Sequence, residues 1–152
     1  MLLYALLWTG LLGWLAAAAW IDVRTQTIPW WLVLSGSALG IGLHSAGQGW
    51  IGAAGATGGL AALAGCLLWF AGAELFWRVA PIGGGDLNLL ALTAAYTGWQ
   101  GPVLVLLLAG LVQTVVYVVA WARGDMRLAR PFAPALLAGA VLLFVWQLAS
   151  GV

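Results

Sequence analysis

Two aspartates stand out in a chain that is otherwise almost continuously apolar. Asp22 follows a long apolar run, and Asp86 follows three consecutive glycines, Gly83, Gly84 and Gly85. A carboxylate at membrane depth is costly, so its presence indicates a function. Two carboxylates a few ångströms apart cannot both ionise easily, so one keeps its proton and the pair titrates as a unit. The ionised member can take a proton from water while the protonated member donates to a carbonyl oxygen, as in aspartic proteases.

The glycines before Asp86 suit the same chemistry. A peptide in a helix hides its carbonyl groups in hydrogen bonds, so a substrate for two aspartates must be locally extended. Backbone without side chains leaves room for a second chain to lie close to the acid. We therefore expect Gly83, Gly84 and Gly85 to form a substrate-facing loop.

Each aspartate also has a purely structural explanation. Asp22 could be an interfacial charge paired with Arg24, which is two residues away. Asp86 could be a helix N-cap after a glycine turn, a common use of aspartate. The chain has only four acidic residues, and both aspartates flank predicted helix ends on one side. Taken together, the two positions favour a shared function.

The remaining reactive side chains do not form a site. Glu74 is spaced i,i+4 from Arg78, which is typical of an ion pair on a helix surface. Asp125 lies among arginines in a predicted loop and is expected to be solvated. The single histidine, His44, is expected near the interface away from the aspartates, and the single cysteine, Cys66, is expected to pack in an apolar run. These residues predict no nucleophile–histidine pair, no metal site and no cofactor.

The composition indicates an integral membrane protein with one domain over residues 1–152. Of the 152 residues, 64% are hydrophobic and 6% are charged, whereas soluble domains carry about 25% charged residues. No positive charge precedes the first apolar run, so we expect a retained helix rather than a cleaved signal peptide. The net charge of +1 does not indicate a nucleic-acid partner.

The apolar segments predict an all-α fold with six transmembrane helices and a glycine-rich loop before the fourth. Gly47-Gln48-Gly49 and Gln100-Gly101-Pro102 are typical of turns, and small residues in the third segment favour close helix packing. The predicted segments cover residues 2–21, 29–46, 50–77, 86–99, 103–121 and 131–150.

The arginines predict the orientation in the membrane. With six segments, all of them fall on one side: Arg24, Arg78, Arg123, Arg127 and Arg130. The positive-inside rule makes that side cytoplasmic. Both termini are then expected outside, and both aspartates at the cytoplasmic boundary.

Three motifs resemble those of the type IV prepilin peptidase family, including its short forms for Flp-type pilins. Asp22-Val23-Arg24 followed by Ile28-Pro29 is similar to the family's first aspartate motif. Gly83-Gly84-Gly85-Asp86 is similar to its Gly-x-Gly-Asp motif, which preflagellin peptidases and presenilins share. Pro131-Phe132-Ala133-Pro134 resembles a proline-rich motif that opens the last helix. The order of these motifs and the six-helix frame cover nearly the whole chain.

The resemblance implies a membrane aspartic endopeptidase of the prokaryotic cytoplasmic membrane. It would cut the leader from prepilins or pseudopilins at the cytoplasmic face, with Asp22 and Asp86 as the catalytic acids. It implies supporting or substrate-binding roles for Gly83, Gly84, Gly85, Arg24, Pro29, Asn88, Pro131 and Pro134. Longer members carry an N-terminal cysteine quartet and methylate the new N-terminus. This sequence shows no such region, so we expect no methyltransferase activity.

Two departures from the family pattern leave alternatives open. Trp30 stands where asparagine is usual after Ile-Pro, and Asn88 stands where lysine is usual after the second aspartate. A degenerate peptidase kept as a pilus-assembly scaffold would fit these departures. A proton-coupled small transporter would instead use the acids as a relay with polar residues near the bilayer midplane. The visible candidates for such a relay are Thr57, Thr93, Gln113 and Thr114.

Overall fold

A computed structural model describes residues 2–49, 51, 57, 84–98, 100–124 and 131–150 of the chain. The described part is helical and contains no strand. Its helices are α1 (Leu2–Thr25), a helix over residues 30–49, α3 (Gly84–Thr97), α4 (Gln100–Ala122) and α5 (Ala133–Ser150). Most of the predicted third segment lies outside the described residues, as do Cys66, Glu74, Arg78, Gly83, Asp125, Arg127 and Arg130.

Helix α1 is longer than the sequence pattern predicted. The apolar run stops at Ile21, but the helix continues to Thr25, and the Gln26 N–H donates to the Asp22 carbonyl at 2.8 Å. Gln26 then takes a left-handed backbone conformation with φ of 53°, which commonly ends a helix. Asp22 therefore lies within the last turn of α1 and not beyond it, so its side chain is held by a rigid element.

The turn predicted at Gly47-Gln48-Gly49 is wrong for Gly47 and Gln48, which are helical, whereas Gly49 at the helix end has a left-handed φ of 61°. Gly47 lies directly against Leu3 of α1, where an added Cβ would overlap the Leu3 side chain. Glycine at this position serves close packing between helices, as is common in membranes. The sequence could not distinguish this use of glycine from a turn.

The turn predicted at Gln100-Gly101-Pro102 is also wrong, because α4 begins at Gln100. Proline is tolerated in the first turn of a helix, where its missing N–H is not needed. The chain turns earlier, at Gly98, which has φ of 71° and donates its N–H to the Ala94 carbonyl at 2.9 Å. Glycine adopts this left-handed conformation without a steric penalty.

Three helices, α1, α4 and α5, are long and apolar enough to cross a membrane. Large apolar side chains are exposed along them, including Leu107 and Leu111 on α4 and Val145 on α5. A helix that is apolar around its whole circumference is typical of a lipid environment. The described residues thus form an all-helical bundle of the kind found in membranes. They contain three candidate spans, so the prediction of six spans is not confirmed.

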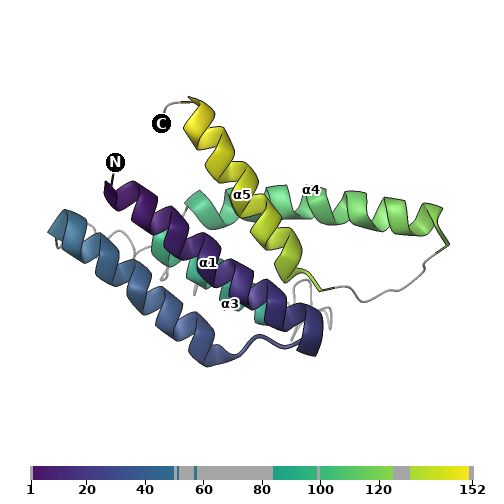
Figure 1. The fold of residues 1–152 in the computed structure, drawn as a ribbon, viewed down its shortest axis with the longest axis horizontal. Coiled ribbons are helices and arrows are strands. Elements are labelled where there is room, and N and C mark those ends of the chain that lie inside the picture. The colour runs from purple at the N-terminus through teal and green to yellow at the C-terminus, as the bar shows by residue number, and fades with distance from the viewer. Residues whose placement is uncertain are drawn as a thin grey trace, which may run out of the picture.

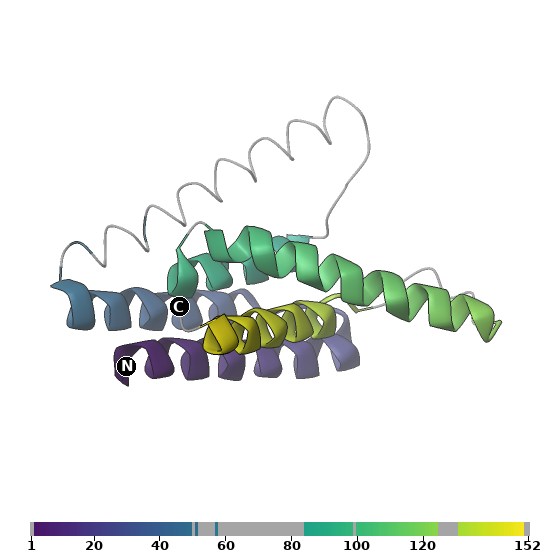
Figure 2. The same cartoon turned by 90° about the horizontal axis from the view of Figure 1, so that it is seen from above.

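The helices pack so that four helix ends meet at one end of the bundle. Helix α1 runs beside the 30–49 helix and beside α3 and α5, and α4 crosses α5 and extends past the others (Figure 1, Figure 2). Fully buried leucines fill the centre: Leu11, Leu15, Leu89, Leu92 and Leu136. The C-terminus of α1 and the N-termini of the 30–49 helix, α3 and α5 converge beyond this core (Figure 1). These ends carry most of the residues that the sequence singled out.

Candidate active site

Asp22 is held inside the bundle by the start of α5. Its side chain is only 8% exposed, and its Oδ2 accepts a hydrogen bond from the backbone N–H of Ala133 at 3.2 Å. Ala133 is the first residue of α5. A carboxylate at a helix N-terminus is stabilised by the free N–H groups and by the helix dipole. This contact joins the first and third sequence motifs.

Asp86 lies in the first turn of α3, outside the three candidate membrane spans, and it is half-buried. Burial, together with the nearby charge of Asp22, raises the pKa of the Asp86 carboxyl from 3.8 to about 6. Burial is the larger cause, because it disfavours the charged form. The charge of Asp22 is the second cause, because a like charge also disfavours ionisation of Asp86.

The glycine stretch before Asp86 differs from the predicted loop. Gly84 and Gly85 are the first two residues of α3, and Gly83 lies outside the described residues. Asp86 lies in the first helical turn, where an acidic side chain is favourable. The prediction of a loop over all three glycines is therefore wrong for Gly84 and Gly85.

Gly85 also makes the contact that joins the two aspartate motifs. A Cβ built on Gly85 would lie 3.2 Å from Ile28 Cδ1 and 3.6 Å from Ile28 Cγ1. Ile28 belongs to the Ile28-Pro29 pair that follows Asp22 in the sequence, and its side chain packs against the core. Glycine at position 85 thus lets the segment after α1 approach the start of α3 closely.

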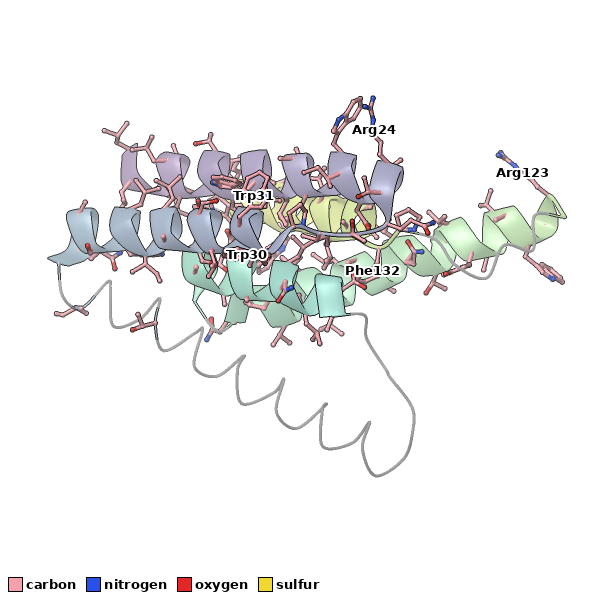
Figure 3. All side chains as sticks on the ribbon, turned by 90° about the horizontal axis from the view of Figure 1, so that it is seen from below. Arg24, Trp30, Trp31, Arg123 and Phe132 are labelled. Carbon is pink, nitrogen blue, oxygen red and sulfur yellow. The ribbon has the colours of Figure 1, made fainter. Side chains whose placement is uncertain are left out.

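Arg24 lies away from the two aspartates. Its guanidinium stacks over the exposed Trp20 ring at 4.0 Å from the ring centroid, and it points away from the bundle (Figure 3). It forms no ion pair with Asp22, so the alternative in which Asp22 is an interfacial charge paired with Arg24 is not supported. A cation beside an indole ring near a helix end suits a membrane interface.

The other residues predicted to support the site make no described contact with either carboxyl group. The Pro29 carbonyl accepts the N–H of Leu32 at 3.1 Å and so starts the 30–49 helix. Trp30, at one of the two departures, is 70% exposed; Figure 3 labels this residue. Asn88, at the other, is also exposed. Pro131 and Pro134 are half-buried at the start of α5.

His44 lies at the opposite end of the bundle. Its Nε2 hydrogen-bonds to the Tyr96 carbonyl at 2.9 Å; because a carbonyl only accepts, Nε2 carries the proton in this contact. The bond satisfies a carbonyl in the last turn of α3. Among the described residues, no group of three or more His, Cys, Asp or Glu side chains could hold a metal ion.

Two site contacts were not predicted from the sequence: the Ala133 N–H that holds Asp22, and the Ile28 side chain that packs on Gly85. Both residues lie inside sequence motifs. The signal that could have found the first is that a buried acid requires donors, and the nearest unused donors are at a helix N-terminus. No local sequence signal reports which helix end supplies them.

A helical bundle with three membrane-competent helices among the described residues defines an integral membrane protein, and Asp22 at the end of α1 and Asp86 at the start of α3 give it an acidic candidate site. Residues 9–119 match the type IV leader peptidase family. The chain belongs to this family, and the matched region contains both Asp22 and Asp86.

Two curated relatives are each named prepilin leader peptidase/N-methyltransferase, from Burkholderia pseudomallei strains 1026b and K96243. This chain is 41% identical to each over 76 residues, which is 49% of this chain and 24% of the relative. The chain therefore spans about a quarter of the length of these relatives. No solved structure matches it.

Proposed function

We propose that this chain is a membrane aspartic endopeptidase that removes the leader of type IV prepilins or pseudopilins. The observation that supports this most is that Ile28, which follows the helix carrying Asp22, packs on Gly85 next to Asp86. In addition, the Asp22 charge helps to raise the pKa of Asp86 to about 6. Membership of the type IV leader peptidase family supports the same activity. Prepilins as substrates come from the names of the curated relatives.

In the proposed mechanism the two carboxyl groups have different roles. Asp86 holds the shared proton, because burial favours its neutral form. Asp22 is the ionised base, held by the Ala133 N–H at a position that favours a negative charge. No metal and no covalent intermediate are required.

The reaction then proceeds by general acid–base catalysis. The Asp22 carboxylate takes a proton from water while the water oxygen bonds to the scissile carbonyl carbon, and Asp86 gives its proton to the carbonyl oxygen. The tetrahedral intermediate collapses with cleavage of the C–N bond. The proton held by Asp22 passes to the leaving nitrogen, and Asp86 recovers a proton from the gem-diol hydroxyl.

We further propose that residues 1–152 form one six-span domain with this site at the cytoplasmic face and both termini outside. The sequence pattern of arginines supports this orientation. Arg24 lies in the last turn of α1 and Arg123 directly follows α4, so both arginines are at helix C-termini (Figure 3). A cytoplasmic site would meet the basic leader of a prepilin before the hydrophobic helix is exported.

A proton relay receives less support from the described residues. Thr93, one of the relay candidates, is buried but donates to the Leu89 carbonyl of its own helix at 2.9 Å. Thr114 likewise donates to the Gly110 carbonyl at 2.8 Å. Both hydroxyl groups thus satisfy themselves locally, whereas a relay needs polar groups that link the aspartates to the other side.

The test is cleavage of co-expressed prepilins, read as leader loss on gels. Asp22→Asn and Asp86→Asn each remove one titratable group while keeping the side-chain size, so each is expected to lower cleavage at least about 1,000-fold. Thermal unfolding in detergent controls for folding, and both variants should melt within a few degrees of the parent chain. Full cleavage by either variant contradicts the two-aspartate mechanism. A parent chain that cleaves no prepilin favours the scaffold alternative.

A further inference from the structure

The start of α5 presents one backbone donor to the aspartate site. The N–H groups of Ala135 and Leu136 both donate to the Phe132 carbonyl, at 2.9 and 3.1 Å. Pro134 has no N–H. The Ala133 N–H is therefore the donor among residues 133–136 that bonds outside the helix, and it donates to Asp22 Oδ2 at 3.2 Å.

This contact fixes the Asp22 carboxyl group from a second helix. Asp22 is buried in the last turn of α1, and among the described residues its Oδ1 accepts no hydrogen bond. One carboxylate oxygen is thus tied to α5. Phe132 packs beside the core, and Ala133 is fully buried, so the donor itself is held in place.

We propose that the Ala133 N–H is a positioning group for Asp22, and that Pro134 leaves it as a single donor aimed at the carboxylate. The inference rests on the proposed function, because it assigns the start of α5 a role in that reaction. It also explains why the proline-rich motif accompanies the two aspartates: α5 orients the base. A charge-assisted bond of this kind is stronger than a neutral one.

The described residues place few charged groups around this carboxylate. Asp86 on α3 faces it electrostatically, and Arg24 on α1 is turned toward Trp20. Helix α5 carries no ionisable side chain, and the only one on the 30–49 helix is His44, bonded to Tyr96 at the opposite end. Among the described groups, a change in pH dependence after loss of the Ala133 donor would therefore report on the two aspartates.

The experiment replaces the amide of Ala133 by an ester, by incorporating lactic acid at position 133 of the full chain. This removes the N–H and keeps the methyl side chain. The matched control is the same replacement at Ala135, whose N–H donates to Phe132 and not to Asp22. Each ester is combined with Asp22→Ala, and melting in detergent is measured for all chains.

The melting data test the contact independently of any activity. The effects of the ester at 133 and of Asp22→Ala are expected to be non-additive, because both remove the same hydrogen bond. The effects of the ester at 135 and of Asp22→Ala are expected to add. Additive effects at position 133 overturn the proposal whether or not the chain cleaves prepilins.

The kinetic data test the positioning role. With the ester at 133, kcat for prepilin cleavage should fall about tenfold or more while KM is unchanged. The acid limb of the pH–activity profile should move to higher pH, because an ionised carboxylate loses a donor. The ester at 135 should leave the profile in place. If the parent chain cleaves prepilins and the ester at 133 leaves both kcat and the pH–activity profile unchanged, the proposal is overturned. If the parent chain does not cleave, the proposed function is contradicted. The melting data then decide whether the contact between Ala133 and Asp22 exists.

Discussion

The contact between Ile28 and Gly85 predicts a specific coupling between the two aspartate motifs. Gly85→Ala adds a Cβ that would lie 3.2 Å from Ile28 Cδ1. That distance is shorter than an ordinary van der Waals contact, so the isoleucine must shift by a few tenths of an ångström. The next Ile28 atoms, Cγ1 and Cβ, lie at 3.6 and 3.8 Å, which are ordinary separations. The clash therefore belongs to one methyl group.

The magnitude follows from two opposing terms. Alanine in place of glycine in a helix gains up to about 1 kcal/mol, and overpacking costs about 1–3 kcal/mol when neighbours cannot move. Ile28 is half-buried and its Cδ1 is the flexible end of the side chain, so the cost should be near the lower limit. Gly85→Ala alone is therefore expected to change the free energy of unfolding by less than about 1 kcal/mol.

The second variant removes only the clashing atom. Ile28→Val lacks Cδ1 and alone should cost about 0.5–1.5 kcal/mol. In that background Gly85→Ala should be stabilising, because the nearest remaining Ile28 atom in the parent chain is at 3.6 Å. The double variant should thus be more stable than the sum of the single effects by at least about 0.5 kcal/mol.

The assay is equilibrium or thermal unfolding in detergent for the four chains, with prepilin cleavage as a second measurement. If Gly85→Ala reduces cleavage by displacing Asp86, then Ile28→Val should restore part of the rate. Strictly additive stability effects would refute the reasoning, since they would mean that the added methyl group does not meet Ile28 Cδ1.

Two further predictions concern pH and helix packing. The pKa of Asp86 is about 6, above its ordinary 3.8, so the folded state binds the proton more tightly than the unfolded state. The stability of the folded chain should therefore fall as pH rises from about 4 through about 6, and cleavage should decline above a pH of about 6. The Asp86→Asn variant should not lose melting temperature over this pH range. A melting temperature that rises over this range in the parent chain would contradict the assignment. Gly139→Ala would place a Cβ 2.8 Å from the backbone nitrogen of Ala109 on α4 and should destabilise the chain by about 1–3 kcal/mol. Gly110→Ala is the control, because an added Cβ there would have nothing within 4 Å. It should be neutral or stabilising in the same melting assay.

The amino-acid sequence by itself determined the class of the protein and its two candidate acids. An apolar composition predicts membrane helices because charged groups are costly in lipid, and the start and end of α5 were predicted to within about two residues. Asp22 and Asp86 were identified because acids are rare in such a chain. These conclusions depend on residue type and local pattern, which the sequence contains directly.

Only the tertiary structure decided which groups touch the acids. The Ala133 N–H reaches Asp22 across the bundle, and Ile28 packs on Gly85, because helix ends that are distant in sequence meet at one end of the core. The glycines show the same limit: Gly47 permits contact with Leu3 and does not form a turn. Local sequence reports conformational freedom, but what a glycine or a helix terminus is used for depends on the helix that packs against it.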